Sequence, residues 1–344
     1  MRFKWPVTLT TGLLLSALLY GCSGGNFTPQ TEVYPNTPDP GTETASPATP
    51  EVVPASDTSP LATLVITTDF GKSLVLEETV EIGEETSALA ALQEVALVET
   101  KYGGGFVRSI NGIDSEYEGA SKQKNDWLFY INGISVRVGA AGYILQAQDV
   151  EHWDFRDWSF RQYVPAIIGD FPEPFVHGYG GKSYPTVVVY QEGWQEEAIQ
   201  IAEMLAESGV ADVSYRPDVD LSDVEKASDN LILVGTGNAA LITEINEPWN
   251  KLGFYARFEE DGLSVYTASG ELAAKHTSEV GIIQATQSPW NPSGTGVCEN
   301  VVWMVSGTDE TGVKQAVDTL INRQDSLKYA YAIVITGDQI LKVP

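Results

Sequence analysis

The segment Trp127–Trp153, WLFYINGISVRVGAAGYILQAQDVEHW, constrains the fold of this chain more than any other. Its first residues, Trp127 to Ile131, alternate between two sets of side chains, and this period of two is typical of a strand. Asn132-Gly133 then predicts a tight turn, because both residues tolerate positive φ. Further strands are predicted over 134–138 and 150–155. The segment therefore predicts short strands joined by tight turns.

The residues upstream predict a hairpin, a helix and another strand. Residues 61–67 and 73–80 have the pattern of a hairpin around Asp69-Phe70-Gly71. A helix follows, with Thr86 or Ser87 as its N-cap, and Gly103-Gly104-Gly105 is expected to end it. Residues 106–112 are the next strand and turn. Hairpin, helix and then strands is the order of a β-grasp domain.

Two motifs in this region carry a resemblance to a known family. Ile110-Asn111-Gly112 precedes a variable loop, and Trp127 to Gly133 reads WLFYING. In this order they resemble the C-terminal β-domain of transcobalamin and intrinsic factor, and the bacterial DUF4430-type domains similar to it. The resemblance covers residues 61–160. Proteins of that family hold cobalamin, so it implies cobalamin or a related corrinoid as the ligand, with an ABC or ECF importer as a partner.

The expected binding site consists of the aromatic side chains of this domain and its turns. If one set faces outward, it can cover the flat, partly apolar corrin; alternatively, these rings pack against the second half of the chain. The ligand-binding candidates are Tyr117, Trp127, Phe129, Tyr130, Asn132, Gly133, Gly139, Tyr143, Trp153 and Trp158. His177, in the linker 161–184, is a candidate axial ligand of the cobalt or, alternatively, a solvated linker histidine.

The N-terminus predicts an extracytoplasmic, lipid-anchored location. Arg2 and Lys4 precede an apolar run that is too short for a membrane span. The run ends in Leu19-Tyr20-Gly21-Cys22, which resembles the lipobox of bacterial lipoproteins. It predicts a signal peptide over 1–21 and a lipidated Cys22; the alternative is an ordinary secretory signal. Residues 22–60 are rich in Pro and Thr and contain no Lys or Arg, so we expect a disordered tether.

Charge and motif content exclude several classes of function. The formal net charge of −27 disfavours nucleic-acid binding. The three histidines lack metal-site spacing, and no serine nucleophile, HExxH or Walker motif occurs. Cys298 has no cysteine partner besides the predicted lipidation site, and we expect a buried thiol. The sequence predicts neither enzyme activity nor a metal site built by the protein.

The second half, residues 185–344, has the pattern of an α/β domain. Residues 186–190, 231–234 and 332–336 are continuous apolar runs, typical of strands buried on both faces of a mostly parallel sheet. Amphipathic helices lie between them. Gly235-Thr236-Gly237 has the shape of a degraded dinucleotide fingerprint, but a glycine turn between strand and helix is the preferred interpretation. This half more weakly resembles α/β modules of prokaryotic S-layer proteins, which implies surface display.

The predicted fold class is α+β, with an N-terminal β-grasp-like domain followed by an α/β domain with a mostly parallel sheet. Two functions are compatible with this organisation. The first is a surface lipoprotein that captures cobalamin or a related corrinoid and delivers it to an importer. The alternative is a structural or adhesive cell-envelope protein that binds protein or glycan.

Overall fold

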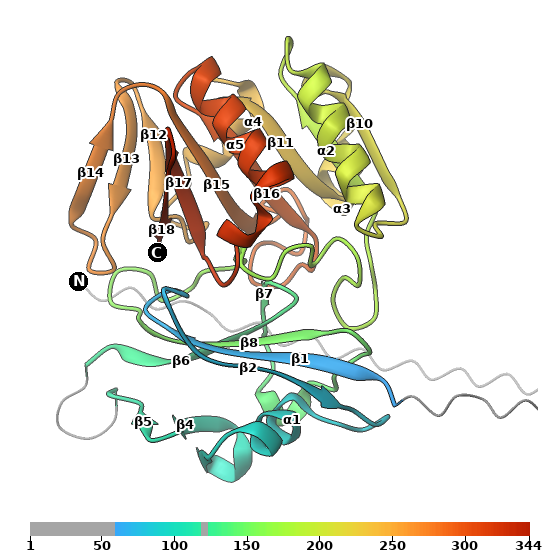
Figure 1. Ribbon diagram of the computed structural model, residues 1–344, viewed down its shortest axis with the longest axis vertical. Helices are drawn as coiled ribbons and strands as arrows, with labels where there is room; N and C mark the ends of the chain where they lie inside the picture. The colour runs from blue at the N-terminus through green and yellow to red at the C-terminus, as the bar shows by residue number, and fades with distance from the viewer. Residues whose placement is uncertain (1–58, 118–122) are drawn as a thin grey trace, which may run out of the picture. The chain divides into compact units, whose positions relative to one another are not determined.

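The N-terminal half is built on a five-stranded sheet, seen in a computed structural model that describes residues 59–117 and 123–344 (Figure 1). β1 runs parallel to β8, and the other neighbouring strands are antiparallel. The spatial order of the strands is β2 (Ser73–Glu81), β1 (Leu61–Thr68), β8 (Val150–Asp157), β6 (Asn125–Ile131) and β7 (Ile134–Ser135).

Both predicted turns of this sheet are present. Asp69, Phe70 and Gly71 all have positive φ, at 55°, 59° and 72°, and they join β1 to β2. Asn132 and Gly133, at 52° and 74°, join β6 to β7. The strand predicted over 134–138 is shorter than expected, because after Ser135 the chain leaves the edge of β6 and enters a short 3₁₀ turn, η2 (Ala140–Gly142).

One helix and a small sheet cover one face of the five-stranded sheet (Figure 1). α1 (Ala88–Val95) begins after Ser87, one of the two predicted N-cap residues, whose side chain accepts a hydrogen bond from the Ala90 N–H. The prediction that the glycine run ends this helix is wrong: α1 ends at Val95, with Ala96 as its C-cap, and a strand follows before the glycines. The small sheet consists of β3 (Val98–Lys101), β4 (Phe106–Ile110) and β5 (Ile113–Asp114), with η1 (Tyr102–Gly104) between β3 and β4.

The second half is built on a seven-stranded mixed sheet. Its first four strands in space are parallel, and the last three are antiparallel to their neighbours, so the sheet is only partly parallel. In spatial order the strands are β10 (Val213–Pro217), β9 (Thr186–Tyr190), β11 (Asn230–Thr236), β16 (Val301–Gly307), β15 (Val280–Gln287), β17 (Ala332–Thr336) and β18 (Gln339–Val343).

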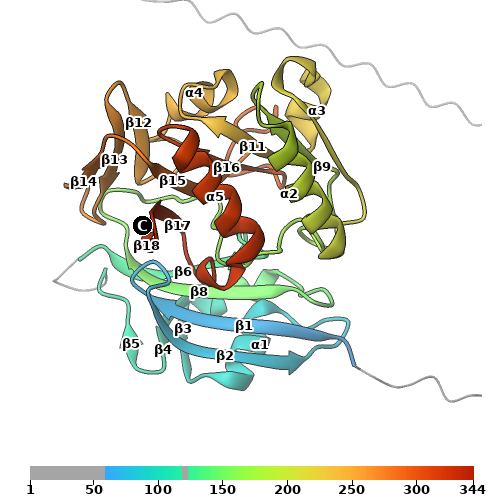
Figure 2. The same ribbon diagram turned by 45° about the horizontal axis from the view of Figure 1, so that its top comes forward.

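Two helices cover one face of this sheet, and a helix together with a small sheet covers the other (Figure 2). α2 (Gln195–Glu207) and α5 (Glu310–Asn322) share one buried cluster with the sheet. α4 (Ala240–Asn246) belongs to the cluster on the opposite face, together with the small sheet. The remaining elements are that small sheet, β12 (Ala256–Glu259), β13 (Gly262–Tyr266) and β14 (Leu272–His276), with α3 (Asp223–Ser228), η3 (Asp218–Asp220) and η4 (Gln324–Ser326).

The two halves share buried side chains, and the described residues fall in one compact unit. Phe70 and Tyr130 from the first half pack with Tyr255 and Tyr331 from the second. The ring centroid of Phe70 lies 5.3 Å from that of Tyr255 and 5.1 Å from that of Tyr331, and both ring pairs are edge-on. Ile134, next to the Asn-Gly turn, belongs to the same apolar cluster as α2 and α5.

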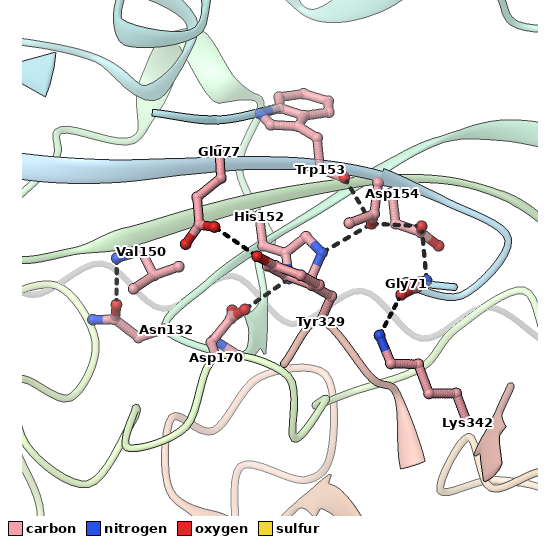
Figure 3. A network of polar contacts seen from close by, with 12 residues as sticks. Gly71, Glu77, Asn132, Val150, His152, Trp153, Asp154, Asp170, Tyr329 and Lys342 are labelled. Carbon is pink, nitrogen blue, oxygen red and sulfur yellow. Dashed lines mark hydrogen bonds and ion pairs between the residues drawn. The ribbon is translucent and has the colours of Figure 1, made fainter. Parts of the chain in front are cut away.

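A buried polar network also joins the two halves (Figure 3). His152 on β8 contacts Asp170 through Nδ1 and Thr67 through Nε2, at 2.7 Å and 2.9 Å. Thr67 donates to Asp154, whose carboxylate also accepts the backbone N–H groups of the hairpin turn. From the second half, Lys342 Nζ donates to the Gly71 carbonyl at 2.8 Å. These contacts satisfy polar groups that the interface removes from water.

Candidate functional site

The aromatic rings of the Trp127–Trp153 segment lie in the core of the N-terminal half. Phe129 stacks on Trp153 with centroids 4.6 Å apart, and Trp127 packs beside Phe155 at 5.3 Å. All four belong to, or pack against, the cluster that includes α1. Trp127 is 5% exposed and Trp153 3%. This face of the sheet is therefore covered by the domain's own helix.

The opposite face of the same sheet is covered by the second half of the chain. Tyr130, at 1% exposure, packs edge-on against Tyr331 with centroids 5.6 Å apart. His152 and Asp154 lie in the buried network on this face. The expectation that the aromatic sheet leaves an open apolar face for a ligand is therefore wrong, and the alternative, packing against the second half, is what the structure shows.

The predicted turn residues Asn132 and Gly133 have structural contacts. Asn132 donates to the Asp149 carboxylate and to the Gly178 carbonyl, both at 2.8 Å, and is completely buried. The Gly133 N–H donates to Asp170 at 2.8 Å. A Cβ at Gly133 would lie 2.9 Å from the Ile167 carbonyl oxygen, so the positive φ and the close approach both require glycine.

The other predicted ligand residues do not converge on one site. Tyr117 and Trp158 form an edge-on pair at the surface, with centroids 5.0 Å apart. Gly139 is exposed and precedes η2. Tyr143 is buried, and its hydroxyl accepts the Gly180 N–H at 3.0 Å. His177, with a side chain 40% exposed, contacts the buried Glu173 carboxylate through Nδ1.

A cavity of about 210 Å³ adjoins the aromatic strand β6. Its lining includes Trp127, Phe129 and Tyr130, and also Arg156, a charged residue that the sequence reasoning did not single out. The volume lies below the roughly 300 Å³ at which drug-sized ligand sites begin. A corrin, larger than a drug-sized molecule, does not fit there.

A wider crevice lies at the carboxyl ends of the parallel strands of the second half. The segment after β9 leads to α2 on one face of the sheet, and the segment after β11 leads to α4 on the other. β9 and β11 are neighbours, so they enclose a topological switch point, where open α/β sheets bind their ligands. Two adjoining cavities, of about 440 and 520 Å³, share Glu192 and Gly193.

Carboxylates dominate the lining of this switch-point crevice. The charged lining residues are Glu192, Glu196, Glu197, Asp218, Glu310 and Lys314. Lys314 pairs with Glu310 at 2.6 Å, which leaves the crevice with an excess of negative charge. Polar Gln191, Thr236 and Asn238 line its floor. No local sequence pattern indicates this site, because its residues meet only when β9 and β11 pair.

The segment Gly235-Thr236-Gly237, at the end of β11, packs against Gln191 and forms the floor of the crevice. Gln191 Oε1 accepts both the backbone N–H and the hydroxyl of Thr236 at 3.0 Å. A Cβ at Gly235 would lie 2.8 Å from Gln191 Cβ, and one at Gly237 2.4 Å from the ring of Phe258. Close packing therefore accounts for both glycines, in agreement with a glycine turn.

A third cavity, of about 670 Å³, lies near the amino ends of β9, β11 and β16. Tyr184, Val224 and Val297 contribute apolar surface to it. Cys298 also borders it, but its Sγ contacts the carbonyl oxygens of Ser288 and Asn300, and burial raises the thiol pKa to about 11. This cysteine is a buried, protonated thiol, as expected.

Within the described ranges, the structure contains no group of three or more His, Cys, Asp or Glu side chains that could hold a metal ion. None of the helices in these same ranges has the length and apolarity required to cross a membrane. Cys22, the predicted signal peptide over 1–21 and most of the tether over 22–60 lie outside the described residues.

No curated protein matches this chain. Among solved structures, it is similar to the crystal structure of a "putative metal binding protein" from Ruminococcus gnavus, with 13% identity and a TM-score of 0.22, over 29% of this chain and 98% of that one. The family model described as "Domain of unknown function (DUF4430)" matches residues 85–157, which confirms the DUF4430-type domain expected from the sequence motifs.

Proposed function

We propose that this protein is a non-catalytic binding protein of the cell envelope, and that it binds a neutral or amino-bearing carbohydrate in the switch-point crevice of its second half. The observation that carries the proposal is the position of the crevice between the ends of β9 and β11. At such a point the two chain segments diverge, and a ligand can reach backbone and side-chain groups from both.

The lining of the crevice favours a ligand with many hydroxyl groups. The carboxylates of Glu192 and Glu197 accept hydrogen bonds, and the amides of Gln191 and Asn238 can both donate and accept. The combined volume of the two adjoining cavities falls in the range of small-molecule sites. The excess of carboxylates repels phosphorylated and other anionic polymers, whereas it attracts the positive charge of a protonated amino sugar and strengthens its binding.

The envelope location rests on the N-terminal sequence pattern, with lipidation at Cys22 and the tether that follows it. The DUF4430 domain has a structural part in this proposal. Its sheet is covered on both faces, so it acts as a rigid base that positions the second half. A structural role at the cell surface agrees with the weaker resemblance of the second half to S-layer modules.

Corrinoid capture is the second candidate, and the DUF4430 match with its transcobalamin-like motifs favours it. The sheet residues Trp127, Tyr130 and Trp153 are buried, so a corrinoid would have to bind elsewhere. The cavity of about 670 Å³ beside Tyr184 is the larger alternative. Absorbance titration of cyanocobalamin with the full chain tests this candidate, because ligation or burial of the corrin shifts its bands.

Calorimetric titration of the full chain with chitosan oligosaccharides and with neutral N-acetylglucosamine oligosaccharides tests the first proposal. We expect saturable binding, weakened by about tenfold or more, or 1.4 kcal/mol, in the double variant Glu192→Gln, Glu197→Gln. Glu203→Gln is the matched control, because Glu203 lies on α2 like Glu197 but is exposed outside the crevice. Absence of binding to both sugars, or equal loss in the control, contradicts the proposal.

A further inference from the structure

We propose that the 210 Å³ cavity beside β6 binds a small organic anion, a carboxylate with a compact apolar body, whose charge is met by Arg156. This site is separate from the switch-point crevice, and the proposal does not depend on the function inferred for that crevice. The two sites have no lining residue in common.

Arg156 is a buried cation without a carboxylate partner. It lies on β8 and is 2% exposed. No ion pair among the described residues involves it, and its Nε has no hydrogen-bond partner there. The carboxylate of Asp154 is occupied by Thr67 and by the backbone of the hairpin turn. A buried charge of this kind is costly unless a counter-charge reaches it.

Weak partners hold the guanidinium in place. Nη1 donates to the carbonyl oxygens of Arg161 at 3.0 Å and Asp157 at 3.3 Å, and Nη2 donates to that of Gln162 at 3.4 Å. The rings of Phe70 and Tyr331 lie 5.3 Å and 5.7 Å from Cζ. These neutral groups orient the side chain and accept three of the five guanidinium N–H groups. An anion in the cavity would supply the strong charge-assisted hydrogen bond that these carbonyl groups do not.

The cavity provides an apolar wall and a polar mouth. Leu128, Tyr130 and Val164 contribute apolar groups to its lining on the side of Arg156. Gln162 and Tyr163 also line it, and both are exposed, so they mark the side that faces solvent. A volume of 210 Å³ holds many times the 10–15 Å³ that one water needs, but less than a drug-sized ligand. A single ring or short chain bearing one carboxylate matches this space.

The test uses benzoate as the probe and benzamide as its uncharged counterpart, titrated calorimetrically into the full chain at constant ionic strength. We expect benzoate to bind about tenfold or more tightly than benzamide, since a charge-assisted bond replaces a neutral one.

Two variants assign the binding to the cavity. Arg156→Met should abolish the preference for benzoate over benzamide. Where the variant does not fold, because the residue is buried, Gln162→Glu decides: it places a negative charge at the exposed mouth of the cavity and should weaken benzoate binding about tenfold. Gln93→Glu, exposed on α1, is the matched control and should leave binding unchanged. Equal affinity for the two probes, or no binding of benzoate, overturns the proposal and leaves the cavity to water.

Discussion

His152 Nδ1 lies 2.7 Å from Asp170 Oδ1, and the two side chains are 0% and 1% exposed. The contact joins β8 of the DUF4430 domain to the segment that leads into the second half (Figure 3). Asp170 also accepts the backbone N–H of Gly133, so one carboxylate fixes both a strand and a turn. The two halves are therefore joined by specific polar contacts as well as by apolar packing.

Asp170→Asn should destabilise the protein by about 1–3 kcal/mol, the usual cost of disturbing a buried hydrogen-bonded group, because Asp170 holds both His152 and the Gly133 N–H. Urea unfolding followed by circular dichroism measures the change. Asp69→Asn is the control, because Asp69 pairs with Lys72 at the surface and its loss should cost at most about 1 kcal/mol. A similar loss of unfolding free energy in both variants would show that the buried contact contributes no more to stability than the surface pair.

Glu151→Gln should stabilise the protein at neutral and alkaline pH. Glu151 is completely buried, and this burial raises its pKa to about 8. The folded state therefore binds the proton more tightly than the unfolded state, in which the carboxyl has the ordinary glutamate pKa of 4.5. Between these two values the stability of the wild type falls as pH rises, by on the order of a few kcal/mol in total. Glutamine removes this dependence.

Urea unfolding of the wild type and Glu151→Gln at pH 4, 6 and 9 checks the sign. The advantage of the variant should be smallest at pH 4 and largest at pH 9, where the wild-type carboxylate is ionised in the core. Glu78→Gln, exposed on β2, serves as the control and should show no such trend. An advantage that is constant with pH would mean that Glu151 does not take up a proton on folding.

Local sequence signals predicted the turns and many of the strands. Asn132-Gly133 adopts the positive φ values that its residue types favour, and Thr186–Tyr190 is a buried strand with the predicted bounds. β15 was missed although it is completely buried, because Gln284, Thr286 and Gln287 interrupt its apolar pattern. Their polar side chains lie in the interior, where burial reflects the sheet around them rather than their own hydrophobicity.

The candidate sites depend on contacts that no local pattern encodes. Period two in Trp127 to Ile131 shows that the strand has two faces, but the packing of α1 and of the second half decides that both are covered. Likewise, Glu192 and Asn238 meet because β9 and β11 are neighbours, although β10 lies between them in the chain. Sheet order is a property of the whole fold.

Phe70→Ala should lower the stability of both halves of the protein by similar amounts. Phe70 is completely buried between Tyr255 and Tyr331, and truncating such a ring typically costs about 3–5 kcal/mol. Hydrogen exchange with peptide resolution should show the amides of β8 and of β16 losing protection by similar amounts. If β8 alone responds, the two halves unfold independently and the shared cluster does not couple them.

Cys298 should be unreactive in the folded protein. Its Sγ is buried, and with a pKa near 11 only about one thiol in a thousand is ionised at pH 8. In a Cys22→Ser chain, Ellman's reagent should therefore find no fast-reacting thiol under native conditions and one in urea. Ser293→Cys in the same background provides the positive control, since this position is exposed in the same loop and should react at once. Rapid native labelling of Cys298 would show that the cavity beside Tyr184 opens far enough to expose the thiol.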